Sequence, residues 1–378
     1  MASDLAMADA ATVSMTPNEA ATGVDAVATD ATDRRFGARR LAYFLGGSLL
    51  LGGGIMVGIV LWARESGLGL DTTIGAVGWQ VLAVAVALHL GAHMAWAARL
   101  WTVSHGTGRG ISYPFAFRLV TAGVFGAAIT PGRAGGEGLR YILLRRHHPE
   151  PDHALRFLLA DRALDFCFFI LAGIPAAIAL PILLGGDVAF RAAAVVGVVV
   201  LAVLFGVLVL LIADPGGLRR LGAPFAGWLR RRMPKAGPRV VRAIDRGLDH
   251  TRDGLRLLLT ERKLYLAGAA VLTVCYWTLE FLVLWVLLGA FGFHPGVVAV
   301  LLGAVVLNLV TAAAATPGAS GIAELAALAI YQGMAPGLSP LFVVLWRLVT
   351  YGYDLAIGGA VAFREGMLTL GRRPSGPA

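Results

Sequence analysis

Charged residues are scarce in this sequence. Asp, Glu, Lys and Arg make up only 15% of the 378 residues, whereas a soluble domain carries roughly 25%. Hydrophobic residues account for 57%, and 49 glycines add to them. A soluble core cannot absorb so much apolar surface, which excludes coiled coils, disordered scaffolds and soluble Rossmann-type enzymes. The composition predicts a polytopic membrane protein.

Cysteine is almost absent. Cys167 and Cys275 lie in separate apolar runs, without a CxxC motif or a metal-ligand spacing, so they predict no disulfide framework and we expect both to fill the core. Histidine is missing after His294. Residues 318–321 have the GxSG form of intramembrane serine proteases, but such a serine needs a downstream histidine as its base, which argues against protease activity.

Lys and Arg are also missing from the first 33 residues. We therefore expect residues 1–36 to form a disordered acidic tail, because a signal peptide would begin with a basic segment. A polytopic membrane domain is expected over 37–365, with a basic cytoplasmic amphipathic insert at 213–263. Residues 366–378 are expected to form a cytoplasmic C-terminal tail.

Long apolar runs are what the sequence has in abundance. Six are long enough to span a bilayer, which takes about 20 residues: 41–62, 77–98, 157–180, 188–212, 264–288 and 341–363. Two further stretches, 115–129 and 297–315, end abruptly in Thr-Pro-Gly and precede short helical stretches at 135–144 and 321–331. The stretch at 115–129 is short for a span, and runs of its length are more often re-entrant.

Basic residues predict the orientation, because cytoplasmic loops are enriched in Lys and Arg. The basic N-terminal flank, the loop at 97–114 that contains Arg99, the loop at 138–156 and the stretch at 214–263 are all placed in the cytoplasm. Both termini are then cytoplasmic, and the two Thr-Pro-Gly hairpins enter from opposite sides. We expect six transmembrane helices plus two re-entrant helical hairpins.

An internal repeat supports this topology. The sequence TPGRAG at 130–135 returns as TPGASG at 316–321, and each copy is followed by a glutamate and, in the next span, an arginine and an aspartate. These residues are Glu137, Arg162 and Asp165 in the first unit, and Glu324, Arg347 and Asp354 in the second. Two units of opposite orientation form an inverted-topology repeat, which is typical of transporters whose site lies at interrupted helices.

The breaks themselves suggest a binding chemistry. Pro and Gly free backbone groups that must be satisfied inside the protein or in a wet cavity. The half-helix after each break presents N–H groups and a positive dipole end, which suit a phosphate or carboxylate. Arg133 adds a donor to the first break only. The alternative is structural: Glu137 and Glu324 cap their own half-helices, and each arginine pairs with the aspartate that follows it.

Charges at membrane depth cost roughly 2.5–3.5 kcal/mol each on insertion scales, so function or pairing is expected for them. They are Arg133, Glu137, Asp161, Arg162, Asp165, Glu280, Glu324, Arg347 and Asp354. Pairing leaves carboxylates over, which permits proton coupling. His89 and His93 lie one turn apart in a span and can bind a metal, but no acidic residue lies near them in the sequence, so we expect packing histidines.

The motifs resemble those of a known family. TPGRxGGExxR at 130–140, TPGxxGxxE at 316–324 and WRLVTY at 346–351 are similar to motifs of the lysylphosphatidylglycerol synthase transmembrane-region family, also called flippase-like. The resemblance covers roughly residues 40–365. It implies a bacterial or archaeal plasma-membrane protein that handles lipids, in the best-understood members by moving a lipid between leaflets. Without an aminoacyl-transfer or glycosyltransferase domain beside it, we expect a stand-alone member.

We therefore expect an all-α integral membrane protein that moves a phospholipid or lipid-linked headgroup across the bacterial plasma membrane. Its expected partners are membrane lipids and a lipid-synthesis enzyme, with no nucleic acid, cofactor or metal. Two other function classes stay open: an intramembrane lipid-modifying enzyme with Glu137 or Asp161 as base, and a non-catalytic subunit of a lipid-synthesis complex. The candidate substrate-binding residues are Thr130, Pro131, Gly132, Arg133, Gly135, Glu137, Arg140, Asp161, Arg162, Thr316, Pro317, Gly318, Gly321, Glu324, Arg347 and Tyr351.

Overall fold

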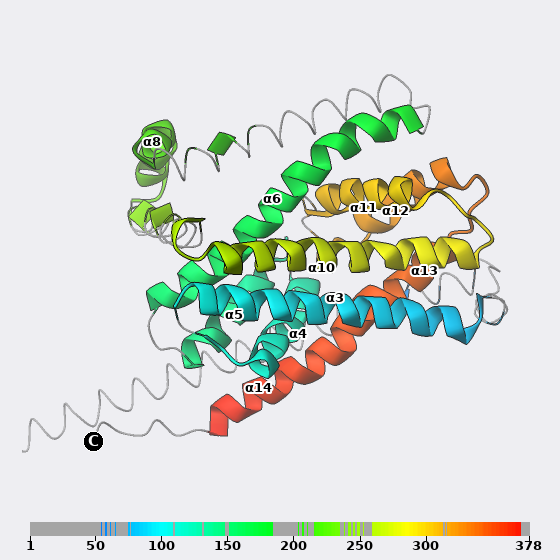
Figure 1. Cartoon of the computed structure of the whole chain (residues 1–378), viewed down its shortest axis with the longest axis horizontal. Helices are drawn as coiled ribbons and strands as arrows, with labels where there is room; N and C mark the ends of the chain where they lie inside the picture. The colour runs from blue at the N-terminus through cyan, green and yellow to red at the C-terminus, as the bar shows by residue number, and fades with distance from the viewer. Residues whose placement is uncertain are drawn as a thin grey trace, which may run out of the picture. The chain divides into compact units, whose positions relative to one another are not determined.

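The computed structural model describes residues 77–147, 151–183, 215–234 and 259–371, except the single positions 109, 131, 313 and 315, together with isolated positions elsewhere. All of them belong to one compact unit, Leu51–Ala378. These residues are mainly helical and contain no β-strand (Figure 1). The elements are α3 (Trp79–Gly106), α4 (Tyr113–Ile129), α5 (Ala134–His147), α6 (Pro151–Leu183), α8 (Pro215–Arg232), α10 (Lys263–Ala290), α11 (Val297–Ala312), α12 (Ile322–Met334), α13 (Leu341–Arg347), η1 (Leu348–Gly352), η2 (Asp354–Gly358) and α14 (Gly359–Gly371).

Four helical segments among the described residues are long and apolar enough to cross a membrane. They are Trp79–Gly106, Phe157–Ile182, Lys263–Ala290 and Leu341–Gly366. They coincide with four of the predicted spans and identify an α-helical membrane protein. The predicted spans at 41–62 and 188–212 lie outside the described residues, as do the tail at 1–36 and the greater part of the insert at 213–263.

The outward faces of these helices are apolar. On α6 and α10, large side chains such as Leu171, Leu264 and Val271 are exposed, and 88% of Leu264 is accessible. Burial of such surface away from water is worth about 25 cal/mol per Å², and lipid tails provide that apolar environment for an outward face. Cys275, which we expected in the core, is instead exposed on α10. The expectation was wrong because a membrane helix is apolar toward lipid as well as toward the core.

Helix α3 is longer than the apolar run that predicted it. We placed Arg99 in a cytoplasmic loop at 97–114, but α3 continues to Gly106 and Arg99 is fully buried. The predicted loop at 138–156 is mostly helical too, because α5 extends to His147 and α6 begins at Pro151. Arg140 in α5 is therefore buried as well. Two of the arginines that supported the topology are buried in the protein, where they pair with acids.

Helices α3 and α10 lie side by side in opposite directions (Figure 1). Gly91 of α3 faces Leu279 of α10, and Gly268 of α10 faces Thr102 of α3. Small residues at such positions let two membrane helices approach closely. The pair forms one wall of the site described below.

The first Thr-Pro-Gly segment joins two antiparallel helices, α4 and α5. A Cβ on Gly126 would lie 2.7 Å from the carbonyl oxygen of Gly135, so only glycine permits this approach. The Thr130 hydroxyl closes the turn, since Oγ1 donates to the Gly126 carbonyl (2.7 Å) and accepts from the Gly135 N–H (2.8 Å). A helix end whose backbone groups would otherwise lack partners is thereby satisfied.

The second segment joins α11 and α12, and here the Thr316 hydroxyl donates to the Ser320 carbonyl (2.9 Å). The Tyr331 hydroxyl of α12 donates to the Val300 carbonyl of α11 (3.2 Å), and Gly303 leaves room for Ile330. At the start of α12, the Gly321 N–H donates to Glu324 Oε2 (2.5 Å). Glu324 therefore caps its own half-helix, as the structural alternative predicted for it.

The two breaks share one backbone feature, although they differ at the sixth position, where Gly321 is left-handed (φ 87°) and Gly135 is not. The third and fourth positions of both copies are left-handed, with φ of 62° and 58° at Gly132 and Arg133, and 58° and 57° at Gly318 and Ala319. A non-glycine residue rarely adopts this conformation. The repeat seen in the sequence is thus also a repeat of local geometry.

The last span is not a regular α-helix. Between α13 and α14 it widens into two π-helical segments, η1 and η2. Segments of this kind are rare and are frequent at functional sites. Arg347 ends α13, Tyr351 lies in η1 and Asp354 begins η2, so the widened part carries the polar residues of the span.

Candidate functional site

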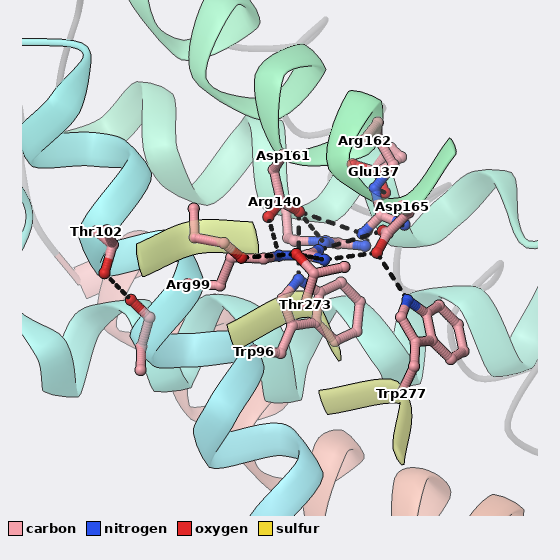
Figure 2. Close-up of polar contacts among 12 residues, drawn as sticks. Trp96, Arg99, Thr102, Glu137, Arg140, Asp161, Arg162, Asp165, Thr273 and Trp277 are labelled. Carbon is pink, nitrogen blue, oxygen red and sulfur yellow. Dashed lines mark hydrogen bonds and ion pairs between the residues drawn. The ribbon is translucent and has the colours of Figure 1, made fainter. Parts of the chain in front are cut away.

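A buried ion-pair network connects α3 to α6. Arg99 donates from Nε to Asp161 Oδ1 (2.8 Å) and from Nη1 to Asp165 Oδ1 (2.5 Å), as Figure 2 shows. Two indole N–H groups also donate hydrogen bonds to these carboxylates: Trp96 donates to Asp161 (3.2 Å) and Trp277 to Asp165 (3.0 Å). Because Arg99 and Asp161 are fully buried, each needs the other to offset its desolvation.

The network continues to the first hairpin. Arg162 Nε lies 2.9 Å from Glu137 Oε1, and Arg162 Nη1 lies 2.8 Å from Asp165 Oδ2. Arg140 donates to the same Glu137 oxygen (2.7 Å) and stacks over the Trp96 ring, 4.5 Å from its centroid. The described cluster thus contains three arginines and three carboxylates and is formally neutral.

The network has an accessible side. The side chains of Arg162 and Glu137 are 28% and 40% exposed, in contrast to Arg99 and Asp161. Glu137 Oε2 and Arg140 Nη1 make no hydrogen bond within the part of the chain that the structure describes. Both atoms are buried, and Arg140 Nη1 lies 3.9 Å from Asp161 Oδ2, so the exposed parts of the network are the rest of the Arg162 and Glu137 side chains.

The second unit repeats the key contact. Arg347 Nε donates to Glu324 Oε1 (2.6 Å), which corresponds to the contact of Arg162 with Glu137. Arg347 Nη2 also donates to the Gly318 carbonyl at the break (2.9 Å). We expected Arg347 to pair with Asp354 in the structural alternative, and this is wrong, because Asp354 faces His89 instead.

Tyr351 joins the two breaks. Its hydroxyl donates to the Ala128 carbonyl near the end of α4 (3.4 Å), and its ring lies against Gly318. Arg347 packs on the same ring, 5.2 Å from its centroid. The second break is therefore held against the first hairpin through one aromatic side chain.

A cavity of about 950 Å³ lies beside these clusters and is lined from both units. Its charged lining consists of Arg133, Glu137, Arg140, Arg162, Asp165, Glu280 and Asp354, and its apolar lining includes Phe166, Phe169, Ile170, Leu309 and Ile330. A smaller cavity of about 100 Å³ includes Gly318, Arg347 and Tyr351 in its lining, and it shares Arg133, Glu280 and Asp354 with the larger one.

The predicted site residues divide into two groups. Gly132, Arg133, Glu137, Arg140 and Arg162 line the larger cavity, and Gly318, Arg347 and Tyr351 the smaller one. The remaining described candidates line neither, and they hold the breaks or the buried network: Thr130, Gly135, Asp161, Thr316, Pro317, Gly321 and Glu324. Pro131 lies outside the described residues.

Sequence reasoning missed several residues of the site. Arg99 was assigned to a loop, although Trp96 and Arg99 are three residues apart and so share a helix face. His89 and His93 were expected to be packing residues, yet both line the larger cavity together with Glu280 and Asp354. No local signal indicated these partners, because Glu280 and Asp354 are distant in the sequence.

Comparison with known proteins agrees with this membrane architecture. The family model of the lysylphosphatidylglycerol synthase TM region matches residues 49–358. A UPF0104 membrane protein from Archaeoglobus fulgidus is 26% identical over 292 residues, covering 76% of this chain and 87% of that protein. Two UPF0104 membrane proteins from Methanothermobacter thermautotrophicus are 23% and 26% identical, over 65% and 68% of this chain and 73% and 75% of their own lengths. Since the family match spans most of the sequence, the chain belongs to the lysylphosphatidylglycerol synthase transmembrane-region family.

Proposed function

We propose that this protein moves a phospholipid or lipid-linked molecule with an anionic headgroup between the leaflets of a plasma membrane. The observation that carries the proposal is the cavity of about 950 Å³, in which arginines and large apolar side chains line the same space. A lipid has the same two-part chemistry, a charged headgroup and apolar chains. The family, which takes its name from a lipid synthase, supports a lipid substrate over a water-soluble one.

Arginines supply the donors that an anionic headgroup requires. Arg133 lines both cavities, and its side chain makes no hydrogen bond or ion pair with any residue the structure describes. Arg140 lines the larger cavity, and its buried Nη1 makes no hydrogen bond with the described residues but lies 3.9 Å from Asp161 Oδ2. Arginine binds phosphate through paired, charge-assisted hydrogen bonds. In this proposal Arg133 and Arg140 receive the headgroup phosphate, and Glu137 meets a cationic group beside it.

The two hairpins then serve the two leaflets. Their equal backbone conformation at the third and fourth motif positions and their equivalent glutamate–arginine contacts support the proposal that they form an inverted-topology repeat and are re-entrant. The shared lining of the two cavities by Arg133, Glu280 and Asp354 offers a point at which a headgroup passes from one to the other.

The position of Asp161 argues against this residue as a catalytic base, whereas Glu137, the other candidate base, lines the larger cavity. As the base of a lipid-modifying enzyme, Asp161 would have to reach a substrate. It is fully buried, is held by Arg99 and Trp96, and lines neither cavity. A non-catalytic subunit would move no lipid by itself, so an assay with the purified chain distinguishes that role as well.

The test is a leaflet-exchange assay. We expect the purified protein, reconstituted into phosphatidylcholine vesicles with a trace of fluorescent phosphatidylglycerol, to make the inner-leaflet label accessible to dithionite. In protein-free vesicles dithionite quenches only the outer leaflet. Arg133→Gln should slow the exchange strongly, because the cavity loses its unpaired cation.

The matched control is Arg219→Gln. Arg219 is an exposed arginine of α8 that binds Asp249, and it lines neither cavity. Its loss should leave the exchange rate unchanged. Exchange that is absent in the unmodified protein, or equally fast with Arg133→Gln, would contradict the proposal.

A further inference from the structure

Four titratable side chains meet at the wall of the larger cavity. His89 and His93 stand one turn apart on α3, and each is only 2% exposed. Asp354 at the start of η2 faces both rings: its Oδ1 lies 3.2 Å from His89 Nε2 and 3.5 Å from His93 Nε2. One ligand atom from each of the three residues lies within 4.8 Å of the others.

The two distances from Asp354 fit a tetrahedral metal site. A zinc ion with metal–ligand distances of about 2.0–2.1 Å places neighbouring ligand atoms about 3.3 Å apart. The two oxygen–nitrogen distances of 3.2 and 3.5 Å lie on either side of that value. Two histidines and one carboxylate are three protein ligands, which leaves a fourth position open. All three residues line the cavity.

Glu280 completes the arrangement from α10. Its Oε2 lies 2.7 Å from Nδ1 of His89, on the far side of the ring from Asp354. A histidine that ligates a metal through Nε2 almost always donates its Nδ1–H to a carboxylate or carbonyl, which fixes the tautomer and the ring orientation. With the proton on Nδ1, the Nε2 lone pair of His89 points at a carboxylate oxygen. Either a metal ion or a second ring proton has to lie between these two acceptors, and the experiment below distinguishes the two.

Charge balance indicates the same chemistry. Within the described residues, no Lys or Arg lies within ion-pair distance of Glu280 or Asp354. Arg133 lines the same cavity without such a contact. Two imidazolium rings would repel each other, since their centroids are 4.4 Å apart. A divalent cation supplies both positive charges and leaves the histidines neutral.

We propose that His89, His93 and Asp354 bind one divalent transition-metal ion, with zinc preferred by ligand type, and that Glu280 orients His89. Nδ1 of His93 is buried without a hydrogen-bond partner in the described part of the chain. The His93 ring thus has an unsatisfied nitrogen beside the proposed ion. The open fourth position takes a water or an anionic oxygen from the cavity. Metal binding does not depend on lipid movement, so either proposal can fail alone.

The experiment measures metal on the full chain. Protein purified in detergent is stripped with a chelator, equilibrated with Zn²⁺ and passed over a desalting column, and bound zinc is counted by mass spectrometry. We expect one zinc per chain. Replacement by Co²⁺ should give the intense visible bands of a tetrahedral site, which reports ligand geometry without any substitution.

Variants locate the ion. His93→Gln and Asp354→Asn should abolish stoichiometric binding, and Glu280→Gln should weaken it by about 10–100-fold, as is usual for a residue that orients a ligand. The matched control is His105→Gln on the same helix, since His105 bonds to the Trp101 carbonyl and lies outside the cluster. It should bind one zinc.

Two results would overturn the proposal. One is an unmodified protein that retains no zinc and gives no tetrahedral Co²⁺ spectrum, which would mean that protons balance the two carboxylates. The other is a His93→Gln variant that binds zinc as tightly as the His105→Gln control. Size-exclusion elution of each variant at the position of the unmodified protein establishes that it is folded.

Discussion

The equivalent pairs Glu137–Arg162 and Glu324–Arg347 differ in their surroundings. Arg162 and Glu137 are partly exposed, and Arg162 keeps Asp165 as a second acidic partner. Arg347 is buried, and Glu324 is both its only carboxylate partner in the described residues and the cap of α12. The same contact therefore stabilises the fold in the second unit and faces the cavity in the first.

This difference predicts unequal effects of one substitution. Glu324→Gln removes the charge opposite a buried arginine, and breaking such a pair costs about 3–5 kcal/mol. We expect a clear drop in the thermal unfolding temperature in detergent. Glu137→Gln leaves Arg162 with Asp165, and it leaves the buried Arg140 with Asp161 at 3.9 Å, so it should lower that temperature less than Glu324→Gln while reducing lipid exchange. Equal destabilisation by both substitutions would show that the two pairs have the same role.

At the scale of the element, the hairpin breaks determine which backbone groups and side chains meet. Each break places two consecutive residues in the left-handed region, where a Cβ costs about 1–2 kcal/mol. Space differs between the copies. A Cβ on Gly132 would meet nothing within 4 Å, whereas one on Gly318 would lie 2.3 Å from the Tyr351 ring. Glycine is therefore required at the second break by both backbone conformation and lack of space, and at the first break by backbone conformation alone.

Alanine substitutions separate these reasons. Gly318→Ala should destabilise more than Gly132→Ala, because the buried Tyr351 ring, held by Ala128 and Arg347, cannot move aside easily. Combining Gly318→Ala with Tyr351→Ala should recover part of the loss, which a double-mutant cycle of unfolding free energies measures.

Gly138→Ala is the control for this series. Gly138 lies inside α5 and its Cβ would meet nothing within 4 Å, so alanine should be neutral or stabilising by up to about 1 kcal/mol. Additive effects of the changes at 318 and 351 would mean that the close approach carries no energetic weight.

At the scale of the whole molecule, the orientation of the described spans in the membrane is predicted from the charges of the loops. Arg99 and Arg140 were among those charges, and because both are buried, fewer loop residues now support the prediction. The antiparallel pair of α3 and α10 gives a direct comparison. Ser112 follows the end of α3, and His294 follows the end of α10, so they should lie on opposite sides of the membrane.

Cysteine labelling tests that orientation. In a background without Cys167 and Cys275, we expect an impermeant maleimide to label His294→Cys on intact cells and Ser112→Cys only after permeabilisation. Both positions are exposed, and the Ser112 side chain makes no capping hydrogen bond, so the substitutions are mild. Labelling of Ser112→Cys on intact cells would place the end of α3 outside and reverse the predicted topology.

The sequence by itself determined the class, the family motifs, four described spans and the positions of both breaks. These features are local: apolar length, Pro-Gly pairs and a repeated TPGxxG pattern are readable within one segment. The recurrence of a glutamate and an arginine in both units was also visible in the sequence. Pairing of each arginine with that glutamate was not predicted and comes from the structure. Asp165 joins Arg162 as expected, but Asp354 does not join Arg347.

Only the tertiary structure decided the partners of the buried charges. The sequence places Arg99 in a loop, but α3 continues to Gly106 and Arg99 meets the acids of α6. The sequence indicates packing roles for His89 and His93, but the fold brings Glu280 from α10 and Asp354 from η2 to them. The physical reason is that a charge buried in an apolar surrounding must find its counter-charge in space, wherever along the chain that group lies. Local periodicity determines which segments become helices, whereas packing of distant helices determines which ionisable groups they share.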